Sequence, residues 1–180
     1  SDGIASKHPG LRVDNCELAG WSHAAVDLRG GNNHRIHHCY IHHNQYQGLG
    51  YGVCLDQAEA LIEYNLFDFN RHSIAGTGRP GTSYEARCNV ELGDSLSHCF
   101  DMHGGRDRKD GTDIAGTWMR IHHNFFGARR PPIVIRGTPE QECRVFRNWF
   151  PRHRPMGDPR GNPAVRCEKN TVVEDNMYAE

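Results

Sequence analysis

One short pattern recurs seven times along this chain of 180 residues and constrains its fold more than any other feature. In each copy an apolar residue precedes an Asn or Cys, and another apolar residue follows one or two places on. The Asn or Cys position is filled in order by Cys16, Cys39, Asn65, Asn89, Asn124, Asn148 and Asn176, at steps of 23, 26, 24, 35, 24 and 28 residues. A repeat of this length is typical of one coil of a parallel β-helix. The leucine-rich repeat has a similar period, but its Leu-x-x-Leu-x-Leu signature is absent.

The recurring Asn points to a tight turn that every coil shares. Asn tolerates the left-handed backbone conformation that most residues avoid, so we expect these asparagines to adopt it at the turn. Their side chains would lie one coil apart, about 4.8 Å, and would hydrogen-bond along the stack. The sequence therefore predicts an asparagine ladder, with Cys as a small substitute in the first two coils.

A second strand follows each turn and alternates apolar with polar residues. The segments are 25–30, 52–57, 73–78, 99–104 and 132–137. Period 2 points Val26, Leu28, Val53, Leu55, Phe100, Met102, Ile133 and Ile135 inward. The residues between them face outward in two columns. One column is Arg29, Asp56, Thr77, His103 and Arg136, and the other is Asp27, Cys54, Ala75, Asp101 and Val134.

Composition agrees with an all-β solenoid that forms a single domain over residues 1–180. Only 37% of residues are hydrophobic and 20 are Gly, which suits many turns and thin core layers. No apolar run has the length of a membrane span. The net charge of −1 gives no overall field toward nucleic acid, although nine Arg and one Lys against four acidic residues make 129–169 basic. Seven Cys without a CxxC spacing are expected to be mostly buried fillers, and a disulfide stays possible.

The two ends of the chain carry expectations of their own. It begins Ser-Asp-Gly without Met or an apolar segment, as a mature secreted product or an excised fragment would. We expect a secreted or cell-surface location. Neither end has an amphipathic helix to cap the solenoid, which suggests part of a larger chain or end-to-end self-association.

Stacked coils with an Asn ladder and a polar outer sheet resemble the pectate-lyase-like superfamily of right-handed parallel β-helix proteins. The resemblance covers nearly the whole chain as a repeat pattern and implies a right-handed helix of about seven coils. That superfamily includes lyases, hydrolases, epimerases, esterases and adhesins, so the resemblance implies a carbohydrate-active protein without fixing the reaction. The polygalacturonase signatures are absent, and 129–136 only loosely matches the Arg-x-Pro-x-x-Arg element of calcium pectate lyases.

The strongest local signal for a site is the segment 98–105, His-Cys-Phe-Asp-Met-His-Gly-Gly. Asp101 and His103 share the outward face, about 6.6 Å apart along the strand, and His98 lies just before it. The coil that holds them is the longest, with its extra residues in the loop 105–116. Additional loop length on a solenoid usually lies on the working face.

The preceding coil adds further candidates. His72 occupies the place that corresponds to His98, so stacking would bring the two imidazoles within about 5 Å. The Gly-rich loop 76–87 then offers Arg79, Tyr84 and Arg87 to a ligand. Phosphate binding by these glycines is disfavoured because neither a helix pattern nor a Lys follows.

These groups favour a polysaccharide lyase acting by β-elimination on an acidic, uronic-acid-containing polymer. The reaction needs a base, an acid for the leaving oxygen, and a positive group on the uronate carboxylate. The assignment is His103 or His72 as base, Tyr84 as acid, and Arg136 or Arg79 on the carboxylate. The substrate-binding residues are expected to be Arg79, Arg87, Arg29 and Asp56.

A divalent metal is the open variant of this site, with no cofactor required. His98, Asp101 and His103, with His72 nearby, offer nitrogen and oxygen donors for a zinc-like ion. The doublets 37–38, 42–43 and 122–123 also suggest ligands, but each recurs at a repeat position opposite the site. A stacked ladder, with Asn44 closing its turn, explains them better.

Two other functions remain open. A glycoside hydrolase needs two carboxylates at a suitable separation, and the outward pair Asp56 and Asp101 would lie about 11 Å apart at the backbone. A non-catalytic solenoid that binds glycans or assembles with copies of itself needs no convergent catalytic groups.

Overall fold

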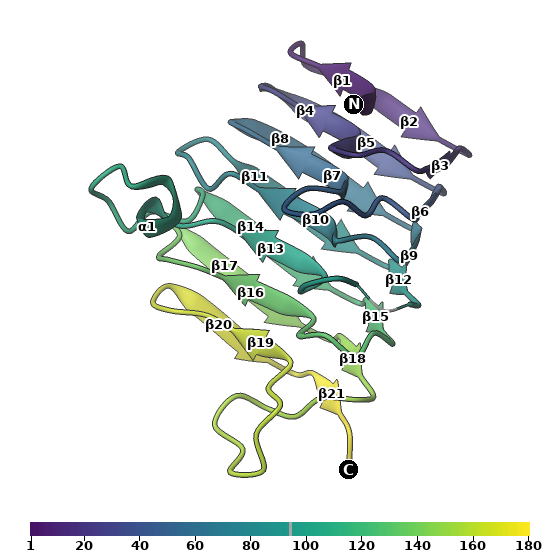
Figure 1. The fold of residues 1–180 in the computed structure, drawn as a ribbon. Coiled ribbons are helices and arrows are strands. Elements are labelled where there is room, and N and C mark those ends of the chain that lie inside the picture. Colours follow the sequence, from purple (N-terminus) through teal and green to yellow (C-terminus); the bar gives the residue numbers. More distant parts are fainter. Residues whose placement is uncertain (94) are drawn as a thin grey trace.

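The computed structural model describes residues 1–93 and 95–180 as a stack of coils that form a parallel β-helix (Figure 1). Each coil gives one strand to each of three seven-stranded sheets, here called sheets A, B and C. Every strand pairs in parallel with its counterparts in the coils before and after it. The all-β solenoid of about seven coils that the repeat predicts is confirmed.

The strands are short, and each sheet collects every third one. Sheet A contains β1 (Asp2–Ser6), β4 (Ala24–Leu28), β7 (Tyr51–Leu55), β10 (His72–Gly76), β13 (Phe100–Met102), β16 (Ile133–Ile135) and β19 (Val165–Arg166). Sheet B contains β2 (Arg12–Asp14), β5 (Gly31–His37), β8 (Ala58–Glu63), β11 (Ser83–Arg87), β14 (Trp118–His122), β17 (Glu142–Phe146) and β20 (Thr171–Glu174). Sheet C contains β3 (Glu17–Ala19), β6 (Tyr40–His42), β9 (Leu66–Asp68), β12 (Val90–Glu91), β15 (Phe125–Phe126), β18 (Trp149–Phe150) and β21 (Met177–Tyr178).

A single turn of helix, α1 (Gly105–Arg108), interrupts the described strands. It lies in the long loop after β13 and projects from the side of the stack in Figure 1. No helix in the described part of the chain has the length and apolar character needed to cross a membrane.

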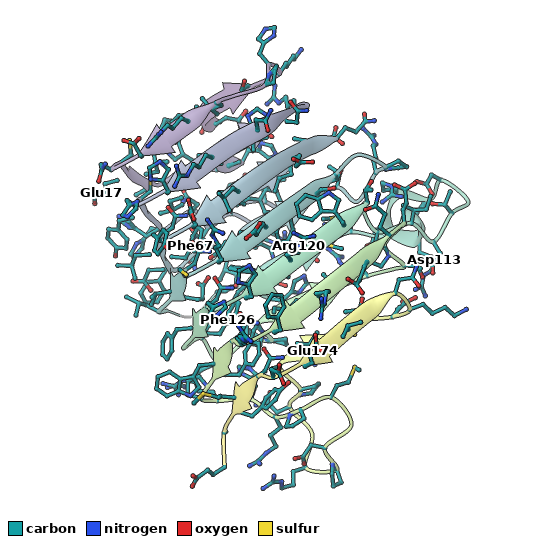
Figure 2. All side chains as sticks on the ribbon, turned by 180° about the vertical axis from the view of Figure 1, so that it is seen from behind. Glu17, Phe67, Asp113, Arg120, Phe126 and Glu174 are labelled. Atoms are coloured by element: carbon teal, nitrogen blue, oxygen red, sulfur yellow. The ribbon has the colours of Figure 1, made fainter. Side chains whose placement is uncertain are left out.

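The core is a column of layers enclosed by the three sheets. All eight residues predicted to point inward from sheet A are buried. Aromatic rings continue the core along the axis, with 4.9 Å between the ring centroids of Phe100 and Phe126 and 5.1 Å between those of Phe126 and Phe150. Figure 2 marks Phe67 and Phe126 along this stack. Because strand residues alternate between faces, burying one face leaves the other free for polar side chains.

The asparagine ladder is confirmed. The amide nitrogen of Asn65 donates to Oδ1 of Asn89 at 3.1 Å, and the same bond links Asn89 to Asn124 at 3.1 Å and Asn124 to Asn148 at 2.9 Å. Each Oδ1 also accepts the backbone N–H of the preceding ladder residue, down to Cys39. These bonds satisfy amides that would otherwise be buried without partners.

The predicted backbone conformation of the ladder asparagines is wrong. The left-handed residue is the one immediately before each ladder position: Asn15, His38, Tyr64, Cys88, His123, Arg147 and Asp175, with φ between 50° and 55°. The ladder position is therefore occupied by Asn for its side-chain amide rather than for its backbone freedom. The same pair of conformations recurs at a second corner, where His43 and Phe69 precede Asn44 and Asn70, and these two amides bond at 2.8 Å.

No disulfide joins any of the seven cysteines, all of which lie in the described part of the chain. Cys39, Cys99 and Cys143 are buried, as expected of small core residues, and the other four are half-buried. Cys39 lies in the ladder column and donates its backbone N–H to Oδ1 of Asn65 at 3.0 Å.

Candidate active site

A cleft of about 250 Å³ opens on the outer face of sheet A, over β7 and β10. Small residues of the two strands, Cys54, Ala75 and Gly76, form its floor. Its walls contain the polar side chains, which include His23, Tyr51, Thr77, Arg79, His103 and Arg108. A concave site with a few convergent polar groups is the usual setting for ligand binding.

Asp101 anchors the polar cluster beside this cleft. It pairs in register with Ala75 before it and Val134 after it, which confirms the predicted outward column. The side chain is nevertheless fully buried, because neighbouring polar residues cover it. Nε2 of His98 lies 2.8 Å from Oδ1, and Nε2 of His103 lies 3.1 Å from Oδ2.

Arg136 completes the cover of Asp101 from the next coil. Its Nε donates to Oδ1 at 3.0 Å and its Nη2 donates to Oδ2 at 2.5 Å. Burial alone would raise the pKa of Asp101, but its close contacts with His103, His98 and Arg136 outweigh it and hold that pKa well below its ordinary value. Asp101 is therefore a fixed anion.

His103 is the imidazole that this anion presents to the cleft. Its Nε2 also lies 2.6 Å from Nη2 of Arg136, because both groups converge on the same carboxylate oxygen. Nη2 of Arg136 can only donate, so Nε2 of His103 accepts this hydrogen bond and the ring proton is on Nδ1, which lies 3.7 Å from Asp107. With 31% of its side chain exposed, His103 has the arrangement of a general base oriented by a carboxylate.

His72 and His98 stack as predicted, with ring centroids 4.4 Å apart. His72 Nδ1 donates to the backbone oxygen of His98 at 2.6 Å, and the His72 ring is fully buried. Burial lowers the pKa of His72 to about 3, so the ring is neutral at physiological pH. The prediction that His72 is a base in contact with substrate is wrong, because a polymer cannot reach a ring enclosed in this way.

Tyr84 is also wrongly assigned. It points into the core from β11 in sheet B, is fully buried, and its hydroxyl has no partner among the described residues. Burial raises its pKa well above the ordinary value. It cannot protonate a leaving group on an external polymer.

Tyr51 is the tyrosine that does reach the cleft. It was not among the site residues predicted from the sequence. It pairs in register with His72 and stacks on that ring at a centroid distance of 5.7 Å. Arg71 donates to its hydroxyl oxygen at 3.3 Å, and burial raises the pKa of Tyr51, so the phenol keeps its proton at neutral pH. The sequence did contain a signal for this position. Tyr51 precedes the inward Val53 by two residues, as His72 precedes Ile74, so stacking of the two rings in neighbouring coils could have been expected.

The four residues predicted to bind substrate separate in the structure. Arg79 lines the cleft and its Nη1 lies 3.1 Å from Asp56 Oδ2, so this pair remains at the site. Arg87 does not, because it lies on sheet B and binds Glu63. Arg29 shares the outward column but is held by Asp2 and Asp27 near the first coil.

Potential metal ligands also differ from the predicted set. Nε2 of His72, Nε2 of His98 and a carboxylate oxygen of Asp101 all lie within 4.8 Å of one another, and His103 is not part of that group. The histidine doublets form local pairs instead, with Nδ1 atoms 2.7 to 2.8 Å apart. Among the described residues, none of these doublets belongs to a group of three candidate ligands.

A second hollow, of about 360 Å³, lies on the far side of Arg136. Arg106, Arg136 and Arg166 line it together with Asp107 and Glu168. The outward column from Cys54 to Arg166 spans four coil steps, about 19 Å, and passes both hollows. The outer face of sheet A thus offers an extended track for a polymer.

The family model described as a right handed beta helix region matches residues 1–105. This match covers more than half of the chain and includes Tyr51, His72, Asp101 and His103. No curated protein and no solved structure matches the chain.

Proposed function

The chain belongs to the right-handed beta helix family, and from that premise we propose that it is a polysaccharide lyase that cleaves a uronic-acid-containing polymer by β-elimination. The fold is consistent with a carbohydrate-active protein. One observation carries the finer proposal: His103, oriented by the buried Asp101, shares the walls of a cleft with Tyr51 and Arg79.

The chain's own residues can carry out each part of the reaction. Nε2 of His103 takes the proton on the carbon beside the uronate carboxylate. The electron pair forms a carbon–carbon double bond as the bond to the glycosidic oxygen breaks, and Tyr51 gives its hydroxyl proton to that oxygen. A cation on the carboxylate stabilises the negative charge that develops between these two events.

Arg79 is better placed for that cationic role than Arg136. Arg136 is bound through two nitrogens to a fully buried carboxylate, so releasing it would leave Asp101 uncompensated. Arg79 is 54% exposed and its pair with Asp56 is a surface ion pair, which contributes about 0–1 kcal/mol. A substrate carboxylate can replace Asp56 at small cost.

The structure disfavours a glycoside hydrolase at this position. None of the described residues that line the cleft is Asp or Glu, and Asp101 is committed to Arg136. Such an enzyme needs two available carboxylates. We place the substrate, an acidic polysaccharide, outside the cell, where a secreted or surface-bound chain meets it.

The test is the ultraviolet absorbance of unsaturated uronide products from a panel of uronic-acid polysaccharides. We expect absorbance to grow with the wild-type chain and to fall by about 10²- to 10⁴-fold in His103→Gln. The matched control is His123→Gln, an exposed histidine at the corner between sheets B and C. A flat trace on every polymer, or full activity in His103→Gln, would reject the proposal, and polymer binding without cleavage would favour a glycan-binding solenoid.

A further inference from the structure

Beside the cleft, two imidazole nitrogens are buried without a hydrogen-bond partner among the described residues. They are Nε2 of His72 and Nε2 of His98. Nε2 of His98 lies 2.8 Å from Asp101 Oδ1, and Nε2 of His72 lies 3.9 Å from Oδ2. A buried polar group without a partner costs about 1–3 kcal/mol, so two beside one carboxylate call for an explanation.

The Nδ1 atom of each ring makes a hydrogen bond that orients the ring and its Nε2 atom. Nδ1 of His72 carries a proton, because it donates to the backbone oxygen of His98 at 2.6 Å. Nε2 of His72 therefore presents a lone pair toward an anion, which is unfavourable unless a cation lies between them. Nδ1 of His98 is bonded to Ser97 Oγ at 3.2 Å. Ligating histidines are commonly oriented by this kind of bond on the second nitrogen.

We propose that His72, His98 and Asp101 bind a divalent transition-metal ion of the zinc class beside the cleft. Two imidazole nitrogens and one carboxylate oxygen match the donors that zinc takes, and three protein ligands leave a fourth position for water. His103 is not a ligand and stays with Arg136 on the other side of Asp101.

A second group of candidate ligands in sheet A, Asp2, His23 and Asp27, lacks this feature. Nδ1 of His23 contacts Asp2 at 2.5 Å, and Arg29 binds both carboxylates. None of the donor atoms in that group is buried without a hydrogen-bond partner.

The ion would also change the charge that faces the cleft, and this consequence rests on the proposed function. With neutral imidazoles, Asp101, Asp107 and Arg136 carry a formal sum of −1 beside a cleft whose own walls carry Arg79 and Arg108. One divalent ion makes the sum +1. Affinity for a polyuronate would then depend on the metal as well as on Arg79.

The test measures metal binding alone, without polysaccharide. The chain is treated with chelator and titrated with Zn²⁺ by calorimetry and with Co²⁺ by visible absorbance, which reports nitrogen and oxygen ligands. We expect one tight equivalent whose dissociation constant weakens by at least about 100-fold in His98→Gln and in His72→Gln, since loss of an outer partner alone costs 10- to 100-fold. The double variant His122→Gln/His123→Gln removes a surface pair and is expected to retain that equivalent.

Each other result is decisive. No tight equivalent in the wild type, or one that survives His98→Gln and disappears in the surface double variant, overturns the inference. Since His72→Gln removes a fully buried ring, circular dichroism is recorded for each variant. If His72→Gln proves to be unfolded, the result with His98→Gln, whose ring is partly exposed, settles the test. Metal binding without lyase activity would reject only the proposed reaction, and lyase activity unchanged by chelator with no bound metal would reject only the ion.

Discussion

Asp101 and Glu91 are both buried carboxylates, and their surroundings shift their pKa values in opposite directions. Asp101 lies on the outer face of sheet A, where Arg136, His98 and His103 hold its pKa well below the ordinary value. Glu91 points inward from sheet C, in register with Phe67 and Phe126, and neither of its oxygens has a partner among the described residues. Burial, with a smaller contribution from Asp68, raises its pKa to about 8. Burial alone therefore does not decide the charge of a carboxylate, because the cations around it can outweigh burial.

The largest expected effect comes from removing the charge of Asp101. Asp101→Asn leaves the guanidinium of Arg136 partly buried without its anion, and breaking a buried ion pair from one side costs about 3–5 kcal/mol. We expect the free energy of unfolding at pH 7, measured with urea, to fall by roughly 3 kcal/mol. The control is Asp14→Asn in the exposed pair with Arg12, where a much smaller loss is expected because solvent screens the pair.

The same variant gives the sign of the acid response. Because the folded pKa of Asp101 is lowered, its contribution to stability is complete above 3.8 and is lost as pH falls through the folded value. The thermal midpoint of Asp101→Asn should therefore fall less than that of the wild type on going to acid. Parallel acid curves for the two proteins would contradict the partnered role.

Glu91 should behave in the opposite way. Its folded pKa is raised, so its contribution is complete below 4.5 and is lost as pH rises toward about 8. At pH 7, Glu91 ionises in the unfolded chain but not in the folded one, which favours unfolding, and Gln cannot ionise. We therefore expect Glu91→Gln to raise the free energy of unfolding by roughly 3 kcal/mol at pH 7 and little at pH 4. Glu59→Gln, on the outward face of β8, is the control, and equal gains at both pH values would exclude this account.

Glu63 supplies an intermediate case. This buried carboxylate on sheet B has two cations, with Nη2 of Arg35 at 2.5 Å and Nη2 of Arg87 at 2.8 Å. Removing one still leaves the other, so we expect Arg87→Gln to lower the free energy of unfolding by only about 1–2 kcal/mol. A loss as large as that of Asp101→Asn would mean that the number of partners does not set the response.

The sequence predicted the fold and half of the site because both depend on the same period. Alternation along the second strand placed Asp101, His103 and Arg136 on one face, and the register of sheet A bears this out. The same alternation contained the correction for Tyr84. Ala86 aligns with the inward Ile62 and Ile121, so Tyr84, two residues earlier, had to point inward as well.

What alternation could not give was the position of side chains around a coil. His98 comes two residues before β13 and Tyr51 is the first residue of β7, where backbone direction rather than period decides what a ring contacts. The burial of Asp101 depends on how far Arg136 reaches across from the next coil. Likewise, the left-handed residue before each ladder Asn follows from corner geometry, which favours no single residue type.

The direction of the asparagine ladder has a consequence for how the chain assembles. Each Oδ1 accepts the backbone N–H of the coil before it, so a corner is completed only when its successor arrives. During synthesis from the N-terminus, the newest coil is always the unfinished one, and its exposed N–H is the template on which the next coil docks. We therefore expect the coils to dock one after another, in the order in which they are synthesised.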